Sequence, residues 1–241
     1  MKKGFTITYE YEGNLYVNTT NRCDYACTFC LRHNESSGGS IYNDNLWLER
    51  EPTREEILAS IESWDLSKFR QLVFCGFGEP AYRLEDICWV IDRMKERGTK
   101  IRTRMNTNGT ANLIHGRDTC PDFAGRFDEV SISLNTDTAE KYEALCRPRY
   151  PGAYKAMKDF ARELTKYVPT VMMTVVDTIP PEEIPLLFER FHKADYSRSM
   201  DREGVGLGLY IVKTILGNLK ENITATSEDG VTQFHFTLTL A

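Results

Sequence analysis

The first three-quarters of the chain alternates between short apolar runs and longer amphipathic runs, and this alternation restricts the fold more than any other feature. Runs typical of strands occur at residues 14–19, 71–75, 100–107, 129–135 and 170–177. Runs with helical spacing of apolar residues separate them, at residues 52–64, 84–97, 137–146 and 153–167. Strands that alternate with helical connections are typical of a parallel sheet. We therefore predict an α/β fold whose sheet is either open or curled into a barrel.

The pattern changes after Ile179. Pro180 and Pro181 interrupt the chain, and helical runs follow at residues 182–191 and 207–219. The sequence ends in two alternating runs, residues 222–227 and 232–240, joined by an Asp229-Gly230 turn that is typical of a β-hairpin. An antiparallel hairpin does not continue a β/α series. We therefore expect two parts, residues 1–180 and a small α+β fragment over residues 181–241.

Charge and hydropathy argue against two classes of partner. Lys and Arg number 30 and Asp and Glu number 35, so the net charge is −5 and no basic surface for a phosphate backbone is expected. No apolar stretch approaches the roughly 20 residues of a membrane span, and Met1-Lys2-Lys3-Gly4 does not begin a signal peptide. We expect no nucleic-acid partner, no membrane partner and a cytoplasmic location.

Three of the seven cysteines cluster directly after the first predicted strand, as Cys23, Cys27 and Cys30. A disulfide framework is improbable in a cytoplasmic protein, so metal binding is the more natural role. Three thiolates on one loop can hold three irons of a [4Fe–4S] cluster and leave the fourth iron open. The alternative is a Zn²⁺ site with His33 as fourth ligand.

The other four cysteines have no partner nearby in the sequence. Cys75, Cys88 and Cys146 fall in or beside predicted strands and helices, where they fit as small apolar residues. Cys120, in Thr119-Cys120-Pro121, has no such explanation.

The cysteine spacing, with Phe29 before the third cysteine, resembles the radical S-adenosylmethionine (SAM) superfamily. The resemblance covers residues 10–179 and includes three further strand ends: Gly76-Phe77-Gly78-Glu79-Pro80, which is similar to the family's Gly-Gly-Glu-Pro turn, Asn106-Thr107-Asn108-Gly109, and Ser131-Ile132-Ser133-Leu134-Asn135. Residues 45–53, 111–118 and 145–149 resemble one branch, the TatD-associated radical SAM proteins.

The resemblance implies a partial (β/α) barrel that lacks its last strand, with a [4Fe–4S] cluster and SAM as cofactors. The reduced cluster would cleave SAM to a 5′-deoxyadenosyl radical, which would abstract a hydrogen from a small-molecule or unknown substrate. A reductant such as flavodoxin or ferredoxin would supply the electron. In folds of this kind, the loops at the carboxyl ends of the strands form the site.

Site roles follow from the resemblance, each with a structural alternative. Gly76 and Gly78 would let backbone approach the methionyl amino group, and Glu79 would accept from it or be a turn charge. The ribose or carboxylate contacts, or else a structural polar network, would come from Asn106, Asn108, Ser133 and Asn135. Phe29 would border the adenine or be a core aromatic residue. No catalytic residue is assigned.

Four charged side chains outside these motifs have weaker interpretations. His115 and Arg117 follow the third predicted strand and would face substrate, or would form a loop cap and a surface pair. Arg147 and Arg149 would clamp a carboxylate or phosphate, or lie in solvent.

Residues 181–241 resemble the C-terminal part of a histidine-kinase ATP-binding domain. The similar stretches are residues 188–191, 195–199, 204–212 and the hairpin 224–240. The helix that carries a Mg²⁺-positioning Asn and the Asp-x-Gly-x-Gly turn of that domain are both missing from the sequence. We therefore interpret the chain as a hybrid with a truncated, nucleotide-free fragment.

Four hypotheses result. The leading one is a radical SAM enzyme. The alternatives are a non-catalytic Fe–S or Zn-binding module, an ATP-binding signalling protein similar to histidine kinases, and an unstable hybrid with little activity.

Overall fold

The computed structural model describes residues 4–30, 32, 40–41, 44–175, 184–190, 208–228 and 231–237. Internal contacts divide the chain into two compact units, Met1–Val175 and Val176–Ala241. The boundary expected at residue 180 lies outside the described residues, as do His33, the Asp229-Gly230 turn, residues 195–199, and Gly204 and Gly206 of the glycine-rich stretch.

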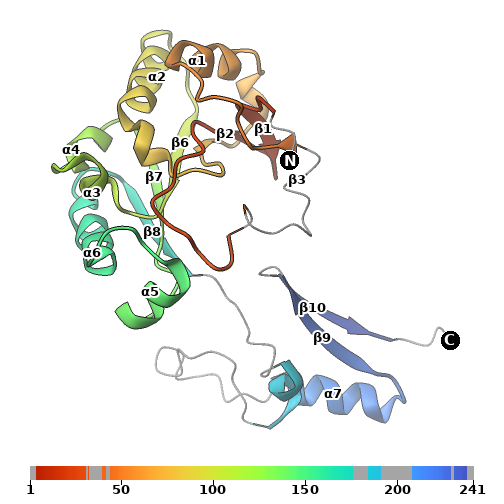
Figure 1. Cartoon of the computed structure of the whole chain (residues 1–241). Coiled ribbons are helices and arrows are strands. Elements are labelled where there is room, and N and C mark those ends of the chain that lie inside the picture. The colour runs from red at the N-terminus through yellow and green to blue at the C-terminus, as the bar shows by residue number, and fades with distance from the viewer. Residues whose placement is uncertain are drawn as a thin grey trace. The chain divides into compact units, whose positions relative to one another are not determined.

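The first unit is built on a sheet with strand order β1-β2-β5-β6-β7-β8 (Figure 1). Its strands are β1 (Thr8–Tyr11), β2 (Asn14–Val17), β5 (Gln71–Phe74), β6 (Arg102–Thr107), β7 (Glu129–Ser133) and β8 (Thr170–Thr174). β1 pairs with β2 in an antiparallel hairpin, and every later pair is parallel. Over the residues that the structure describes, this sheet does not close on itself. The predicted α/β fold with an unclosed, partial barrel is confirmed.

Helices connect the parallel strands. They are α1 (Arg54–Glu62), α2 (Leu84–Glu96), α3 (Ala111–His115), α4 (Cys120–Phe123), α5 (Ala139–Cys146) and α6 (Ala153–Leu164). The connections also contain the 3-10 turns η2 (Leu66–Lys68) and η3 (Pro80–Arg83). A separate pair of short strands is formed by β3 (Ser40–Ile41) and β4 (Asp44–Asn45). α1 begins at Arg54, within the helical run predicted over residues 52–64, because Thr53 Oγ1 accepts from Glu56 N (3.2 Å) and the Glu56 carboxylate accepts from Thr53 N (2.8 Å).

One face of the sheet forms the core of this unit. Leu72 and Phe74 of β5, Met105 of β6, and Val130 and Ile132 of β7 alternate along their strands and are fully buried in one cluster with apolar residues of the helices. The residues between them, such as Arg104, Asn106, Ser131 and Ser133, belong to the opposite face.

β8 forms one edge of the sheet, and its burial is poor. Met172 is 36% exposed, Met173 42% and the following Val175 62%, whereas Val130 and Ile132 of neighbouring β7 are inaccessible. Among the described residues, no strand pairs with the outer edge of β8. This is the place where a further strand would continue the barrel.

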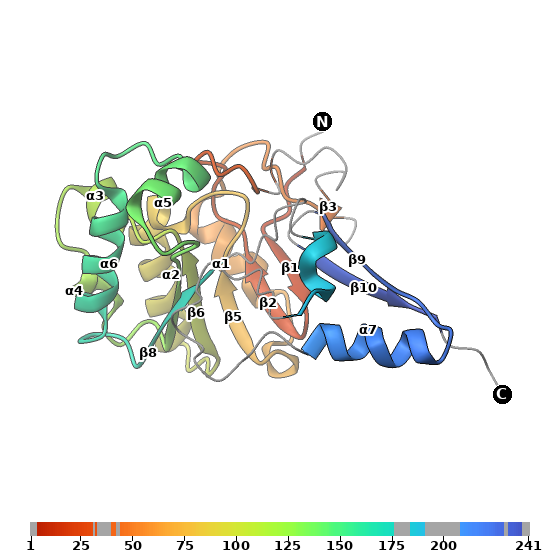
Figure 2. The ribbon, with the colours of Figure 1, turned by 90° about the horizontal axis from the view of Figure 1, so that it is seen from below.

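The second unit contains η4 (Ile184–Phe188), α7 (Gly208–Asn218) and the antiparallel strands β9 (Ile223–Glu228) and β10 (Val231–Phe236). The hairpin and helix α7 were both predicted, and Figure 2 shows α7 beside the two strands. Its small core contains Leu187, Phe188, Leu216 and Ile223. In neither unit is a described helix both long and apolar enough to cross a membrane.

Candidate functional site

The loop that carries the three cysteines leaves the carboxyl end of β2 and is fastened to the end of α5. Ala26 N donates to Cys146 O (3.3 Å), Thr28 N donates to Leu145 O (2.9 Å), and Arg149 N donates to Asp24 O (2.8 Å). Because β2, β5 and β6 are parallel and adjacent, their carboxyl ends meet at the same edge of the sheet. The loop is therefore held between that edge and α5.

All three cysteine side chains are half-buried and free of disulfides. Burial, with a contribution from the Glu79 charge, raises the pKa of the Cys23 thiol to about 12. A hydrogen bond to the Cys146 thiol, together with burial, raises the pKa of Cys27. These shifts favour the protonated thiols of Cys23 and Cys27, whereas a bound metal ion would deprotonate them.

The thiols of Cys23, Cys27 and Cys30 suit an iron–sulfur cluster, but the three sulfur atoms do not converge on one point. Among the described residues, no three Cys, His, Asp or Glu side chains lie close enough together to hold a metal ion. Cys27 is engaged with Cys146 on another element. Three thiols on one short loop fit the chemistry of the cluster, and binding it requires Cys27 to leave Cys146.

Gly76 and Gly78 allow the turn after β5 to approach the cysteine loop closely. A methyl group on Gly78 would overlap Thr20 O and lie 2.7 Å from Arg22 O, both backbone atoms. A methyl group on Gly76 would lie 2.7 Å from Asn18 Cγ. Both glycines therefore have a packing function within the chain, beside the cofactor approach that the resemblance implies.

Glu79 connects three segments at this edge of the sheet. Its carboxylate is 4% exposed and accepts from Thr107 Oγ1 (2.6 Å), Asn108 N (2.7 Å) and Ala81 N (3.0 Å). Its own N–H donates to Arg22 O (2.7 Å). Burial raises the pKa of Glu79 to about 7, although the three donors act in the opposite direction.

A second buried carboxylate, Asp24, anchors the cysteine loop to the end of β6. Asn108 Nδ2 donates to Asp24 Oδ1 (2.8 Å) and Thr110 Oγ1 donates to Asp24 Oδ2 (2.9 Å). Asp24 and Thr110 were not singled out from the sequence. The signal available was a single acidic residue between two cysteines, which fits a solvated loop equally well.

The other predicted SAM contacts occupy different surroundings. Asn106 Oδ1 accepts from Arg104 Nε (2.8 Å), and the Asn106 side chain is also hydrogen-bonded to Cys75. Ser133 is half-buried at the end of β7. Asn135 is buried with a left-handed φ of 60°, and its Nδ2 donates to Cys146 Sγ (3.3 Å). Phe29 packs half-buried against the main core.

The four side chains with weaker interpretations either have other partners within the chain or are exposed. His115 Nε2 is 2.8 Å from Ala81 O, and Arg117 pairs with Asp122 at 2.7 Å. Arg147 and Arg149 are exposed. Cys120, unexplained by sequence, is fully buried in the main core.

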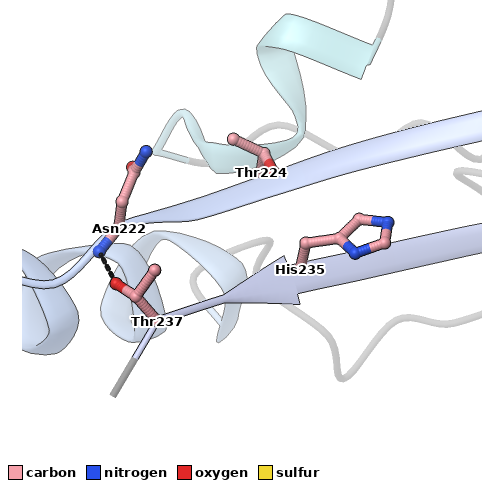
Figure 3. A pocket seen from close by; sticks show the side chains of 4 residues that line it. All are labelled: Asn222, Thr224, His235 and Thr237. Atoms are coloured by element: carbon pink, nitrogen blue, oxygen red, sulfur yellow. Dashed lines mark hydrogen bonds between the residues drawn. The ribbon is translucent and has the colours of Figure 1, made fainter. Parts of the chain in front are cut away.

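The second unit has a hollow of about 130 Å³ on its hairpin (Figure 3). Its lining consists of Asn222, Thr224, His235 and Thr237. Asn222 N donates to Thr237 Oγ1 (3.0 Å), which closes the ends of the two strands. All four residues are exposed and none is a predicted site residue, so we assign no role to this hollow.

A family model for the radical SAM superfamily matches residues 17–191. The chain belongs to this superfamily. The radical SAM match includes the three cysteines, the Gly76–Glu79 turn and the parallel strands β5, β6, β7 and β8, and it begins at Val17, the last residue of β2. A second model, described as histidine kinase-, DNA gyrase B- and HSP90-like ATPase, matches residues 162–241. These residues include the whole of the second unit.

Curated relatives point to the same second similarity. Sensor histidine kinase CusS of Escherichia coli (strain K12) is 45% identical over 60 residues, which are 25% of this chain and 12% of that protein. Sensor protein SrrB of Staphylococcus aureus (strain NCTC 8325 / PS 47) is 29% identical over 150 residues, 61% of this chain and 24% of that protein. The radical SAM chain thus spans less than a quarter of either relative's length.

Proposed function

We propose that the chain is a radical SAM enzyme in which Cys23, Cys27 and Cys30 hold a [4Fe–4S] cluster that binds SAM at its open iron. The observation that carries the proposal is the three-cysteine loop at the carboxyl end of β2, anchored beside the Gly76–Glu79 turn in a chain of this superfamily. When bound, the reduced cluster supplies the electron that cleaves SAM, so that a 5′-deoxyadenosyl radical abstracts hydrogen from substrate.

The chain's own residues would position the cofactors and keep water from them. Asp24 and Glu79 fix the cysteine loop against β6 through buried hydrogen bonds. Of the proposed SAM contacts, Asn106 and Ser133 are half-buried and belong to the sheet face opposite the core. Asn108 and Asn135 are engaged with Asp24 and Cys146, so they would act by supporting the loop. Phe29 would border the adenine.

The proposal also covers the branch of the superfamily, the substrate class and the reductant. Residues 45–53, 111–118 and 145–149 support the TatD-associated branch. We propose a small-molecule substrate and a flavodoxin- or ferredoxin-type reductant.

Anaerobic reconstitution of the full chain with iron and sulfide tests the proposal. We expect about four irons and four sulfides per chain, and reductive cleavage of SAM to 5′-deoxyadenosine and methionine. Cys23→Ala, Cys27→Ala and Cys30→Ala should each abolish cleavage, whereas the matched control Cys88→Ala, a buried cysteine outside the loop, should retain it. Stable Zn²⁺ binding without SAM cleavage would establish the non-catalytic module instead.

The similarity to histidine kinases raises the question of whether residues 181–241 bind a nucleotide. We propose that this fragment shares ancestry with the ATPase domain but does not bind ATP. Ile211 (49%) and Ile215 (54%) of α7 and Leu219 (62%) directly after it are exposed along one stripe, as expected of a helix that lacks part of its domain. Calorimetric titration with a non-hydrolysable ATP analogue should show no binding. Binding that is lost in Gly208→Val would favour the signalling protein.

A further inference from the structure

The radical SAM chain contains a pair of thiols that the proposed chemistry does not use together. Cys27, a proposed cluster ligand, lies beside Cys146 in the last turn of α5, because the residues on either side of Cys27 are hydrogen-bonded to the backbone of Cys146 and Leu145. Cys146 is inaccessible to solvent, whereas Cys27 is half-buried. A buried cysteine opposite a metal-ligand cysteine is therefore a specific feature of this fold.

Three contacts fix this juxtaposition. Ala26 N and Thr28 N donate to the carbonyl oxygens of Cys146 and Leu145, on either side of Cys27. Asn135 Nδ2 donates to Cys146 Sγ (3.3 Å) from the end of β7. The backbone of the loop and the partner sulfur are thus both held, so the two cysteines lie on facing segments, as a disulfide requires.

We propose that Cys27 and Cys146 form a reversible disulfide in the cluster-free protein. The oxidant is a low-molecular-weight disulfide such as oxidised glutathione. Cys27 and Cys146 lose their two protons and two electrons as the Sγ–Sγ bond forms, and the sulfur–sulfur bond of the oxidant breaks to give two thiols. Transient, redox-sensing disulfides of this kind are the type found in reducing compartments.

The consequence for the cluster rests on the proposed function. A Cys27 that is bonded to Cys146 cannot ligate iron, so the disulfide blocks cluster assembly until a thiol reduces it. Conversely, a cluster that engages Cys27 removes one partner and prevents the disulfide. The pair therefore makes cluster loading dependent on the thiol–disulfide state of the surroundings.

The disulfide is tested on the reduced, metal-free full chain. After treatment with oxidised glutathione, free thiols are alkylated and the chain is digested with trypsin. We expect the peptide of residues 23–32 linked to the peptide of residues 142–149, with loss of two hydrogen atoms. The link should persist in the double variant Cys23→Ser/Cys30→Ser, disappear in Cys146→Ser, and persist in the control Cys120→Ser. Exclusive linkage within residues 23–32 would overturn the proposal, and this wild-type result does not depend on the folding of any variant.

Iron uptake separates this inference from the proposed function. The pre-oxidised wild-type chain should lose most of its iron and sulfide uptake relative to the reduced chain, and dithiothreitol should restore it. Equal uptake by the oxidised and reduced chains would overturn the regulatory consequence. A reduced chain that takes up no cluster would refute the proposed enzyme, yet the peptide link would still establish the disulfide.

Discussion

Asn108 Nδ2 donates to Asp24 Oδ1 at 2.8 Å, across 84 residues of sequence, and both side chains are buried. This bond joins the cysteine loop to the end of β6, while the Asn108 N–H donates to Glu79 (2.7 Å). One asparagine therefore connects the two carboxylates at the carboxyl edge of the sheet. The position of the cysteine loop depends on this buried polar network as well as on apolar packing.

Removal of the Asp24 carboxylate should destabilise the first unit. Asp24→Ala leaves the buried donors Asn108 Nδ2 and Thr110 Oγ1 without their acceptor, which we expect to cost about 3 kcal/mol in the free energy of unfolding. Urea denaturation followed by circular dichroism measures this. The matched control is Asp137→Ala, an exposed carboxylate paired with Lys141, which should leave the unfolding midpoint unchanged. An equal effect of the two substitutions would contradict the anchoring role.

Glu79 should make stability dependent on pH. Burial raises its pKa in the folded chain to about 7, above the ordinary value of 4.5. The folded state then binds the proton more tightly than the unfolded state, so the stabilisation is fully present below the unfolded pKa and is lost as the pH rises through 7. Relative to Glu79→Gln, which stays neutral, the wild-type chain should lose stability between about pH 5 and about pH 8.

Urea unfolding of the wild-type chain and of Glu79→Gln, at about pH 5 and at about pH 8, measures this difference in the free energy of unfolding. A wild-type chain that gains stability relative to Glu79→Gln over this range would show that the donors Thr107, Asn108 and Ala81 outweigh burial and keep the carboxylate ionised.

The strands and main helices could be predicted because their signals are local. The run predicted at residues 129–135 is confirmed as β7, but the strand ends at Ser133 because Asn135 adopts a left-handed φ. β1 was missed, although residues 8–11 alternate. Its hairpin turns at Glu12 and Gly13 with φ of 47° and 72°, and Glu-Gly is not among the usual dipeptides for such a turn.

The candidate site was predictable only in part, because only some of its features are local in the sequence. Cysteine spacing is a property of one loop, whereas the Asp24–Asn108 bond and the Cys27–Cys146 pair join segments that meet only after folding. From sequence, Cys146 fits as a packing residue. It is indeed buried in the main core, but its sulfur also contacts a proposed ligand. Which polar residues at the strand ends face one another depends on the register of the sheet.

Gly78 should tolerate no side chain. In Gly78→Ala the new methyl group would overlap the carbonyl oxygens of Thr20 and Arg22, and backbone atoms cannot move aside without displacing the cysteine loop. We expect a loss of about 3 kcal/mol in the free energy of unfolding and reduced iron uptake on reconstitution. Gly217→Ala is the matched control, since nothing lies within 4 Å of its added methyl group. Iron uptake equal to wild type in Gly78→Ala would show that the close approach is dispensable.

The exposed edge at β8 should make the chain prone to association. Met173 is 42% exposed on a strand whose outer edge is unpaired among the described residues, and apolar edge strands favour pairing with other chains. Met173→Lys should reduce aggregation, measured by light scattering during mild heating, at a cost below about 1 kcal/mol. Ile132→Lys, on the adjacent strand β7, buries its charge in the core and should unfold the first unit. If Met173→Lys also unfolds this unit, β8 is covered in solution, and the edge is not free.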